Sequence, residues 1–211
     1  MRIALLGPAP PDRGGIAHET ARLAEGLSML CAVDYLTYSR PYPRWLDPRR
    51  FDVDPRLSAA PARPIFDYLS PLSWRRTAER IAASAPAAVL VPWWTSFWGL
   101  PVRALFRQLA RRAPGVPRVM LCHNLEDHES GPLQRFLTQG ALGAARAFVV
   151  HSEESRDALK RRFPQAPVLA VPLPSLSLEE AGASRQDARR ELGLSPEPLV
   201  LFLGLVRRYK G

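Results

Sequence analysis

The stretch from Met1 to Ala24, Met-Arg-Ile-Ala-Leu-Leu-Gly-Pro-Ala-Pro-Pro-Asp-Arg-Gly-Gly-Ile-Ala-His-Glu-Thr-Ala-Arg-Leu-Ala, decides the fold class. Its apolar run Arg2–Leu6 is short and is followed by glycine, which is typical of a buried strand. The segment Ile16–Met29 repeats apolar residues at helical spacing and predicts an amphipathic helix that packs on a sheet. A strand, a glycine-containing loop and a helix in this order indicate the first unit of a parallel sheet.

The same alternation continues along the chain. Further strands are expected at Ala32–Thr37, Ala87–Pro92, Arg118–His123, Ala147–His151 and Val168–Val171. The helices expected between them are Leu72–Ser84, Phe97–Arg112, Pro132–Ala145 and Ser152–Phe163. This order predicts an α/β fold, a Rossmann-like parallel sheet with helices on both faces.

Two proline-rich stretches interrupt the pattern. Tyr38–Pro64 holds six prolines and is expected to be a long functional surface loop. Pro172–Pro198 surrounds a short helix that Ser184 caps and Gly193 ends, and it is interpreted as a linker. The expected organisation is a first domain over residues 1–174, a linker over 175–197, and the start of a truncated second α/β domain over 198–211, opened by a strand at Leu199–Leu203.

The composition is that of a soluble globular protein, with 46% hydrophobic and 23% charged residues. Collagen, low-complexity disorder and disulfide scaffolds are therefore excluded. Cys31 and Cys122 lack the paired spacing of a zinc site or a disulfide framework, and no apolar run has the length of a signal peptide core or a membrane span. A cytoplasmic location is expected, because free thiols persist in a reducing compartment.

The chain carries a net charge of +9, and only Lys160 and Lys210 among its 29 basic residues are lysines. A positive field of this size suits nucleic acid, anionic lipid or phosphate-bearing substrates. The sequence contains no recognition helix, zinc finger, RRM signature or KH-type loop, so nucleic acid is not an expected partner.

Three segments carry residues suited to chemistry. The first is the loop Gly7–Gly15, where Gly14 and Gly15 precede a helix whose N-terminal N–H groups could bind an anion. The loop does not have the dinucleotide GxGxxG pattern, which disfavours a nicotinamide or flavin enzyme. The alternative is that the two glycines serve only a tight turn.

The second segment, Cys122–Glu129, follows a predicted buried strand and places His123 at the point where that strand ends. A histidine there could hydrogen-bond a substrate hydroxyl or phosphate. The spacing matches neither HExxH nor a zinc pair, so no metal is expected. The alternative is a histidine that caps the strand beside a solvated acidic loop.

The third segment, Phe202–Gly211, is a strand-like run followed by Arg207, Arg208 and Lys210. Two cations after a glycine could bind the phosphates of a ligand held in a cleft. By spacing alone it is only a basic loop.

Together these segments resemble the retaining glycosyltransferases of family 4, along essentially the whole chain. The resemblance rests on Gly14-Gly15, the strand ending in His123, the step Val149-Val150-His151-Ser152-Glu153, the exit Val171-Pro172, and Phe202-Leu203-Gly204 followed by Arg207-x-x-Lys210-Gly211. It implies the N-terminal domain of a GT-B fold plus the first strand of the C-terminal domain.

The resemblance also implies roles for single residues. Arg207 and Lys210 would bind the diphosphate of a nucleotide-sugar donor, with no metal or other cofactor needed. Gly14 and Gly15 would form an acceptor-side loop, with Gly15 facing the donor phosphate, and His123 would contact the transferred sugar as a catalytic residue. The implied reaction is sugar transfer with retention of configuration.

In that family the nucleobase pocket and most phosphate contacts belong to a second domain. The chain is therefore expected to be an inactive fragment of a transferase, whose donor-holding cleft cannot close. A nucleotide-sugar 2-epimerase of the same fold and a non-catalytic basic binding domain remain alternatives.

The acceptor is expected to be a sugar or a lipid-linked sugar, since lipid-linked acceptors are common in the family. Trp93, Trp94, Phe97 and Trp98 precede an arginine stripe at Arg103, Arg107 and Arg111. Such a pattern suits either peripheral contact with an anionic membrane, on its inner face, or a core aromatic cluster beside a solvated helix face, and the second is favoured.

Overall fold

The computed structural model describes residues 1–12, 14–43, 62–126, 131–173 and 184–201. Its contacts divide the chain into two compact units, Met1–Pro172 and Leu173–Gly211. The first unit contains a parallel sheet of seven strands. In the second unit, the described residues form one short helix, α6 (Arg185–Glu191).

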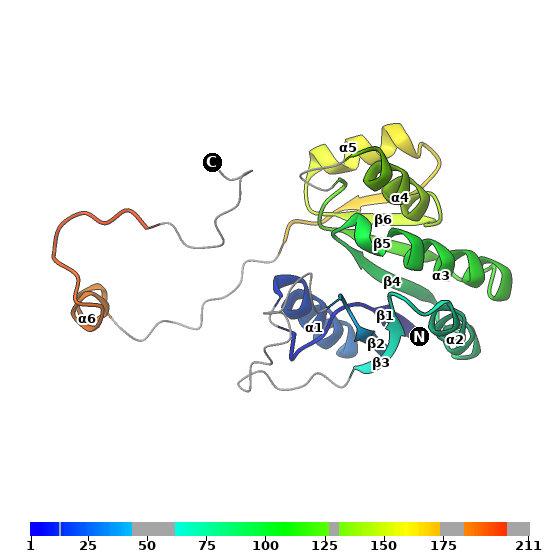
Figure 1. Cartoon of the computed structure of the whole chain (residues 1–211), viewed down its shortest axis with the longest axis horizontal. Coiled ribbons are helices and arrows are strands. Elements are labelled where there is room, and N and C mark those ends of the chain that lie inside the picture. The colour runs from blue at the N-terminus through cyan, green and yellow to red at the C-terminus, as the bar shows by residue number, and fades with distance from the viewer. Residues whose placement is uncertain (13, 44–61, 127–130, 174–183, 202–211) are drawn as a thin grey trace. The chain divides into compact units, whose positions relative to one another are not determined.

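All the strand pairs of the sheet are parallel, in the order β3-β2-β1-β4-β5-β6-β7 (Figure 1). The strands are β1 (Arg2–Leu6), β2 (Ala32–Arg40), β3 (Arg63–Asp67), β4 (Ala88–Trp93), β5 (Arg118–Cys122), β6 (Ala147–Val150) and β7 (Val168–Ala170). The chain adds β2 and β3 on one side of β1, and β4 to β7 on the other. The order therefore reverses between β1 and β4, which is where ligands of doubly wound sheets bind.

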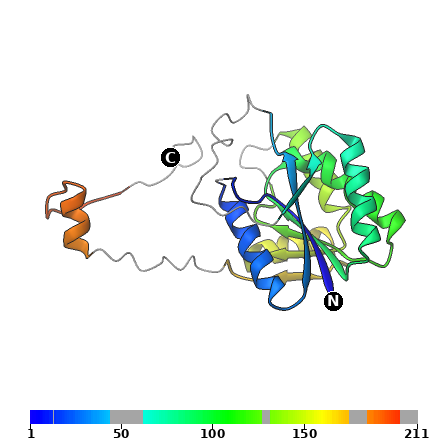
Figure 2. The same ribbon diagram turned by 90° about the horizontal axis from the view of Figure 1, so that it is seen from below.

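The helices form two layers, one on each face of the sheet, as the sequence predicted (Figure 2). They are α1 (Gly15–Ser28), α2 (Pro71–Ala83), α3 (Gly99–Arg112), α4 (Pro132–Leu142) and α5 (Glu153–Arg162), and a 3-10 turn, η2 (Ser96–Trp98), precedes α3. Ala4 and Leu6 of β1 face the larger core, which α2 to α5 cover, whereas Leu5 faces a smaller core under α1. Successive side chains of β1 point to opposite faces of the sheet, so this strand contributes residues to both cores.

Strand β3 was not predicted. The prediction of a loop over Tyr38–Pro64 is wrong at both ends, because residues 38–40 belong to β2 and residues 63–64 belong to β3. Strand β2 continues to Arg40, where it pairs with β3, and Phe66 of β3 is fully buried. Pro64 is tolerated because β3 is the edge strand of the sheet. The pairing depends on residues distant in sequence, so local composition could not reveal it. Residues 44–61 lie outside the described part of the chain.

The predicted helix caps are confirmed. Ser152 accepts a hydrogen bond from the backbone N–H of Ser155 at the start of α5, and Ser184 does the same for Asp187 at the start of α6. Gly193 follows the end of α6 with a φ of +63°, the left-handed backbone that glycine adopts without steric cost.

The predicted strand at Leu199–Leu203 is not present in its described part. Residues Leu199, Val200 and Leu201 are exposed and form no strand. A strand needs a neighbouring strand to satisfy its backbone N–H and C=O groups, and the described residues provide none for this segment. Residues 202–211 lie outside the described part. None of the helices in the described ranges is long and apolar enough to cross a membrane.

Candidate functional site

Four loops of the first unit meet at one edge of the sheet. Because the strands are parallel, the loops that follow β1, β4, β5 and β6 all leave from the carboxyl edge. These loops carry the glycine pair, Trp94, His123 and His151, respectively. The sequence therefore placed its first two candidate segments correctly at the ligand-binding edge of a doubly wound sheet.

The glycine loop is held by buried contacts at its start. The Tyr35 hydroxyl donates a hydrogen bond to the carbonyl oxygen of Pro8, at 2.8 Å, and burial raises the pKa of Tyr35, so the hydroxyl stays protonated and remains a donor. Gly7 has a packing reason to be glycine, since a Cβ there would lie 2.8 Å from Cγ2 of Thr20 and 3.0 Å from Cγ of Pro92.

At Gly14 and Gly15, by contrast, packing within the described structure does not require glycine. Helix α1 begins at Gly15, and its N-cap is Gly14, whose φ of −74° any residue can adopt. A Cβ at either position would meet nothing within 4 Å, so neither a tight turn nor packing requires glycine there. The open N-terminus of α1, without a capping side chain, remains available to a ligand anion.

A cavity of about 90 Å³ opens beside this pair. Gly14 and Gly15 line one part of it, and Tyr38, Tyr42 and Trp94 line another. The indole Nε1 of Trp94 donates a hydrogen bond of 3.0 Å to the hydroxyl of Tyr42, which fixes the indole at the cavity wall. Apolar rings beside a few directed polar groups are the usual lining of a small-molecule site.

His123 lies deeper along the same edge. Its backbone N–H donates to the carbonyl of Trp93, at 2.8 Å, and the side-chain amide of the next residue, Asn124, donates to the carbonyl of Trp94, at 3.3 Å. These two bonds tie the loop after β5 to the end of β4. His123 is therefore positioned relative to the aromatic wall by backbone contacts.

Two further residues join His123 in a cluster. Nδ1 of His123 lies 3.3 Å from Oε2 of Glu19 on α1, and Nε2 of His151 lies 3.7 Å from Oε1 of the same carboxylate. The two imidazole rings have centroids 5.0 Å apart. The ring atoms and the carboxylate thus converge from a helix and two strand ends.

Burial governs the electrostatics of this cluster. Desolvation, assisted by the neighbouring His151, lowers the pKa of His123 to about 4, so its ring is neutral at pH 7 and its contact with Glu19 is a hydrogen bond rather than an ion pair. Desolvation also raises the pKa of Glu19, and the charge of His151 opposes that rise.

The structure brings Gly14, Gly15 and His123 to one edge, but Arg207 and Lys210 lie outside the described residues. Sequence reasoning missed Glu19 and the role of His151. His151 had a signal, because it ends the predicted strand Ala147–His151, as His123 ends the predicted strand Arg118–His123. Glu19 had none beyond its place one helical turn after Gly15.

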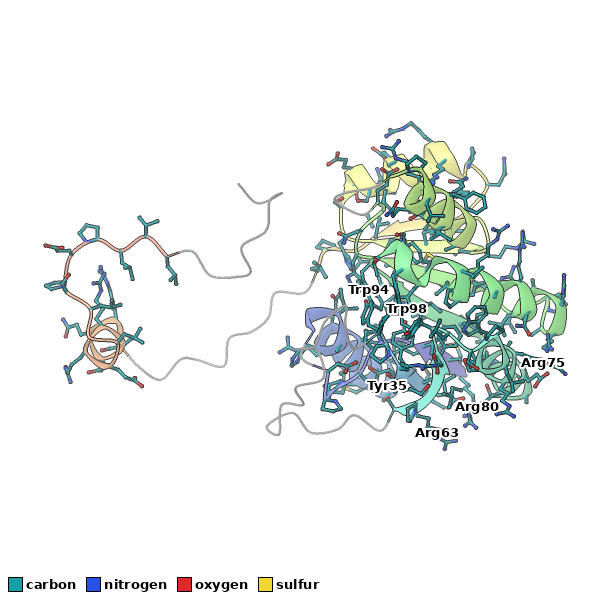
Figure 3. All side chains as sticks on the ribbon, in the orientation of Figure 1. Tyr35, Arg63, Arg75, Arg80, Trp94 and Trp98 are labelled. Atoms are coloured by element: carbon teal, nitrogen blue, oxygen red, sulfur yellow. The ribbon has the colours of Figure 1, made fainter. Side chains whose placement is uncertain are left out.

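The aromatic cluster proved to be mainly core. Trp93 and Trp98 are almost completely buried, and the ring of Tyr38 stacks on Trp98 with centroids 4.2 Å apart. The interpretation as a membrane-facing aromatic surface is therefore wrong for these two residues, and the favoured core interpretation holds. The arginines Arg63, Arg75 and Arg80, by contrast, project from the surface (Figure 3).

Comparison with known proteins gives one informative match. The family model described as "Glycosyl transferase 4-like domain" matches residues 14–174. No curated protein matches the chain. Among solved structures, 2,3-dimethylmalate lyase, a member of the PEP mutase/isocitrate lyase superfamily, is similar with a TM-score of 0.37 and 15% identity over 91% of this chain and 73% of that one. A likeness this low adds nothing to the assignment. Since the family model covers most of the chain, including Gly14, Gly15 and His123, the chain belongs to the glycosyl transferase 4-like domain family.

Proposed function

We propose that this chain is the acceptor-side part of a retaining glycosyltransferase that uses a nucleotide-sugar donor. Family membership supports glycosyl transfer in general. The observation that carries the finer proposal is the pair Gly14 and Gly15, which the fold does not require and which borders a cavity with an aromatic wall. Two residues without side chains, at positions where the fold does not require glycine, allow a phosphate or a sugar to approach the backbone closely.

In the proposed reaction the bond between the anomeric carbon of the donor sugar and the diphosphate oxygen breaks, and the diphosphate leaves with the electron pair. The acceptor hydroxyl oxygen attacks the same face of the anomeric carbon, and its proton passes to the departing phosphate oxygen. Configuration is then retained. Arg207 and Lys210 would neutralise the departing diphosphate, without a metal ion at the phosphates.

The histidine at the edge would act as a neutral group. Because the pKa of His123 is about 4, its imidazole exchanges hydrogen bonds with a sugar hydroxyl at pH 7 and contributes no positive charge. Charge stabilisation is therefore left to Arg207 and Lys210. We expect residues 1–211 alone to bind ligand without measurable transfer, because in the resembling family most donor contacts belong to a second domain.

The test compares this chain with the same chain extended by any coding sequence that follows Gly211 in its gene. Both are titrated with UDP- and GDP-sugars by calorimetry, and turnover is followed by NMR, which also gives the anomeric configuration of the product. We expect turnover with retention from the extended chain and a loss of at least about a hundredfold with Arg207→Ala or Lys210→Ala. Inversion, or epimerisation of the donor without an acceptor, would refute the proposal.

The glycine pair is tested by Gly15→Ala, with Gly26→Ala as the matched control on the same helix. A Cβ meets nothing within 4 Å at either position, so both variants should fold. In the extended chain only Gly15→Ala should lower kcat/KM, because only that methyl group lies at the cavity. Equal activity of the two variants would remove the main support for the proposed site.

We also propose a lipid-linked acceptor and peripheral contact with an anionic membrane on its cytoplasmic face. Leu72, Leu100, Leu133 and Phe136 are more than half exposed, and all lie in the first two turns of α2, α3 and α4, toward the carboxyl edge of the sheet. The guanidinium of Arg103 lies over the ring of Phe136, at 5.9 Å from its centroid. Exposed apolar side chains beside arginine suit an interface with anionic lipid.

Cosedimentation with vesicles tests the membrane proposal. The chain should pellet with phosphatidylglycerol vesicles more than with phosphatidylcholine vesicles, and the double variant Leu133→Ser/Phe136→Ser should remain in the supernatant. The double variant Leu192→Ser/Leu194→Ser, in the second unit, removes exposed leucines elsewhere and should still pellet. Equal pelleting of the two double variants would count against this surface.

A further inference from the structure

The cluster of Glu19, His123 and His151 contains buried ring nitrogens that hydrogen bonding among the described residues does not account for. Nδ1 of His151 lies 3.1 Å from the carbonyl oxygen of Val171. A carbonyl only accepts, so Nδ1 must carry the proton. Nε2 of the same ring faces Oε1 of Glu19 at 3.7 Å, which is too far for a direct hydrogen bond. A metal ion bonded to both atoms would fit between them.

Within the described residues, Nε2 of His123 and Nε2 of His151 are both buried and have no hydrogen-bond partner. The carboxylate of Glu19 has ion-pair contacts with these two rings only, among the residues that the structure describes. No arginine or lysine of that part forms an ion pair with Glu19. Buried nitrogens without a hydrogen-bond partner are rare in folded proteins, and a bound ion is one cause of them.

We propose that Glu19, His123 and His151 form a site for a zinc-type divalent cation at the carboxyl edge of the sheet. Two imidazole nitrogens and one carboxylate oxygen are a donor set that favours zinc and its transition-metal neighbours over magnesium or calcium. The three candidate ligand atoms all lie within 4.8 Å of one another. Tetrahedral zinc, with bonds of about 2.0–2.1 Å, needs ligand atoms about 3.3 Å apart, so small side-chain shifts close the site.

The surroundings of the ligands match those of metal sites. The bond from His151 Nδ1 to the Val171 carbonyl fixes the tautomer and the ring orientation, as the outer contacts of zinc-bound histidines do. The Glu19 side chain is 24% exposed and that of His151 is 15% exposed, so water or a sugar hydroxyl could reach a fourth position.

The site differs from the sequence expectation of no metal, because its ligands come from α1 and from the ends of β5 and β6. No spacing motif can reveal ligands that only the sheet brings together. The inference does not depend on the proposed transferase, whose arginine and lysine act at the donor phosphates. A cation bound through Nδ1 of His123 would still leave Nε2–H for a sugar hydroxyl.

The experiment uses the 211-residue chain, stripped with a chelator and titrated with zinc chloride by calorimetry at pH 7.5. We expect one zinc ion per chain and no binding of magnesium. Glu19→Gln and His151→Gln should each weaken zinc binding at least about tenfold. His18→Gln, the matched control next to Glu19 and outside the cluster, should bind like the wild type.

A second measurement on the wild type covers the case in which a variant fails to fold. Ring ¹⁵N signals of the four histidines are recorded with and without zinc, and two of them, those of His123 and His151, should shift. Absence of zinc binding, equal binding by the cluster variants and the wild type, or shifts at other histidines would each overturn the proposal.

Discussion

The comparison of Gly15→Ala with Gly99→Ala separates a glycine kept for a ligand from one kept for packing. At Gly15 a Cβ meets nothing within 4 Å, and the backbone is the start of a helix. Alanine there costs no contact and restricts the unfolded chain, so the free energy of unfolding should rise by about 0.4–1 kcal/mol. At Gly99 a Cβ would lie 2.7 Å from Cβ of Leu137 and 2.9 Å from its carbonyl oxygen.

That contact is far closer than the roughly 3.5–4.0 Å at which carbon atoms attract one another. The neighbour is the backbone of α4, which cannot rotate away, so Gly99→Ala should cost about 1–3 kcal/mol. For a chain of this length, about 1 kcal/mol corresponds to roughly 2–4 °C in Tm. Gly15→Ala should therefore raise Tm by about 1–4 °C, and Gly99→Ala should lower it by about 2–12 °C.

Differential scanning calorimetry and urea unfolding, followed by far-UV circular dichroism, measure both variants. Gly26→Ala, also free of contacts, gives the reference for a harmless helical alanine. If Gly15→Ala were destabilised as strongly as Gly99→Ala, glycine at position 15 would serve the fold. The glycine pair would then give no support to a ligand site at this loop, whatever the activity measurements showed.

Three further predictions test the fold and its thiols. Ser152→Ala removes the cap of α5 and should lower the free energy of unfolding by about 1 kcal/mol. Ser184→Ala removes the cap of α6, in the second unit, and should leave the temperature of the main calorimetric transition unchanged. A main transition that is shifted by Ser184→Ala and not by Ser152→Ala would contradict the division into units. Phe66→Ala, in the unpredicted strand β3, should cost about 3–5 kcal/mol in urea unfolding, and a cost below about 1 kcal/mol would mean that β3 is not part of the core. Burial raises the pKa of the Cys122 thiol, so at pH 8 a thiol reagent should label only Cys31 quickly. Cys31→Ser should therefore abolish the fast phase of labelling. A fast phase that persists in this variant would mean that Cys122 is accessible, contrary to the prediction.

The sequence predicted well wherever a local pattern determines local structure. The strand β1 and the helix α1 follow from a short apolar run, a glycine loop and an amphipathic repeat within the first 28 residues. The caps Ser152 and Ser184 were readable because a capping side chain bonds a backbone N–H only three residues away. His123 was readable as a site candidate because it follows a buried strand, and parallel strands carry their ligands at that end.

Other features have no local signal because they are contacts between distant segments. Strand β3 pairs with the end of β2, and Tyr38 stacks on Trp98, only after the sheet and α3 have formed. The cluster of Glu19 with His123 and His151 arises because α1 packs beside the ends of β5 and β6.

The sequence by itself thus predicted the α/β class, the order of most elements and the position of Gly14, Gly15 and His123 at the carboxyl edge, since hydrophobic periodicity and capping act within a few residues. Only the tertiary structure decided which side chains meet at that edge. Burial there neutralises His123 and leaves two histidine nitrogens and a carboxylate facing one another, and neither effect exists until the chain is folded.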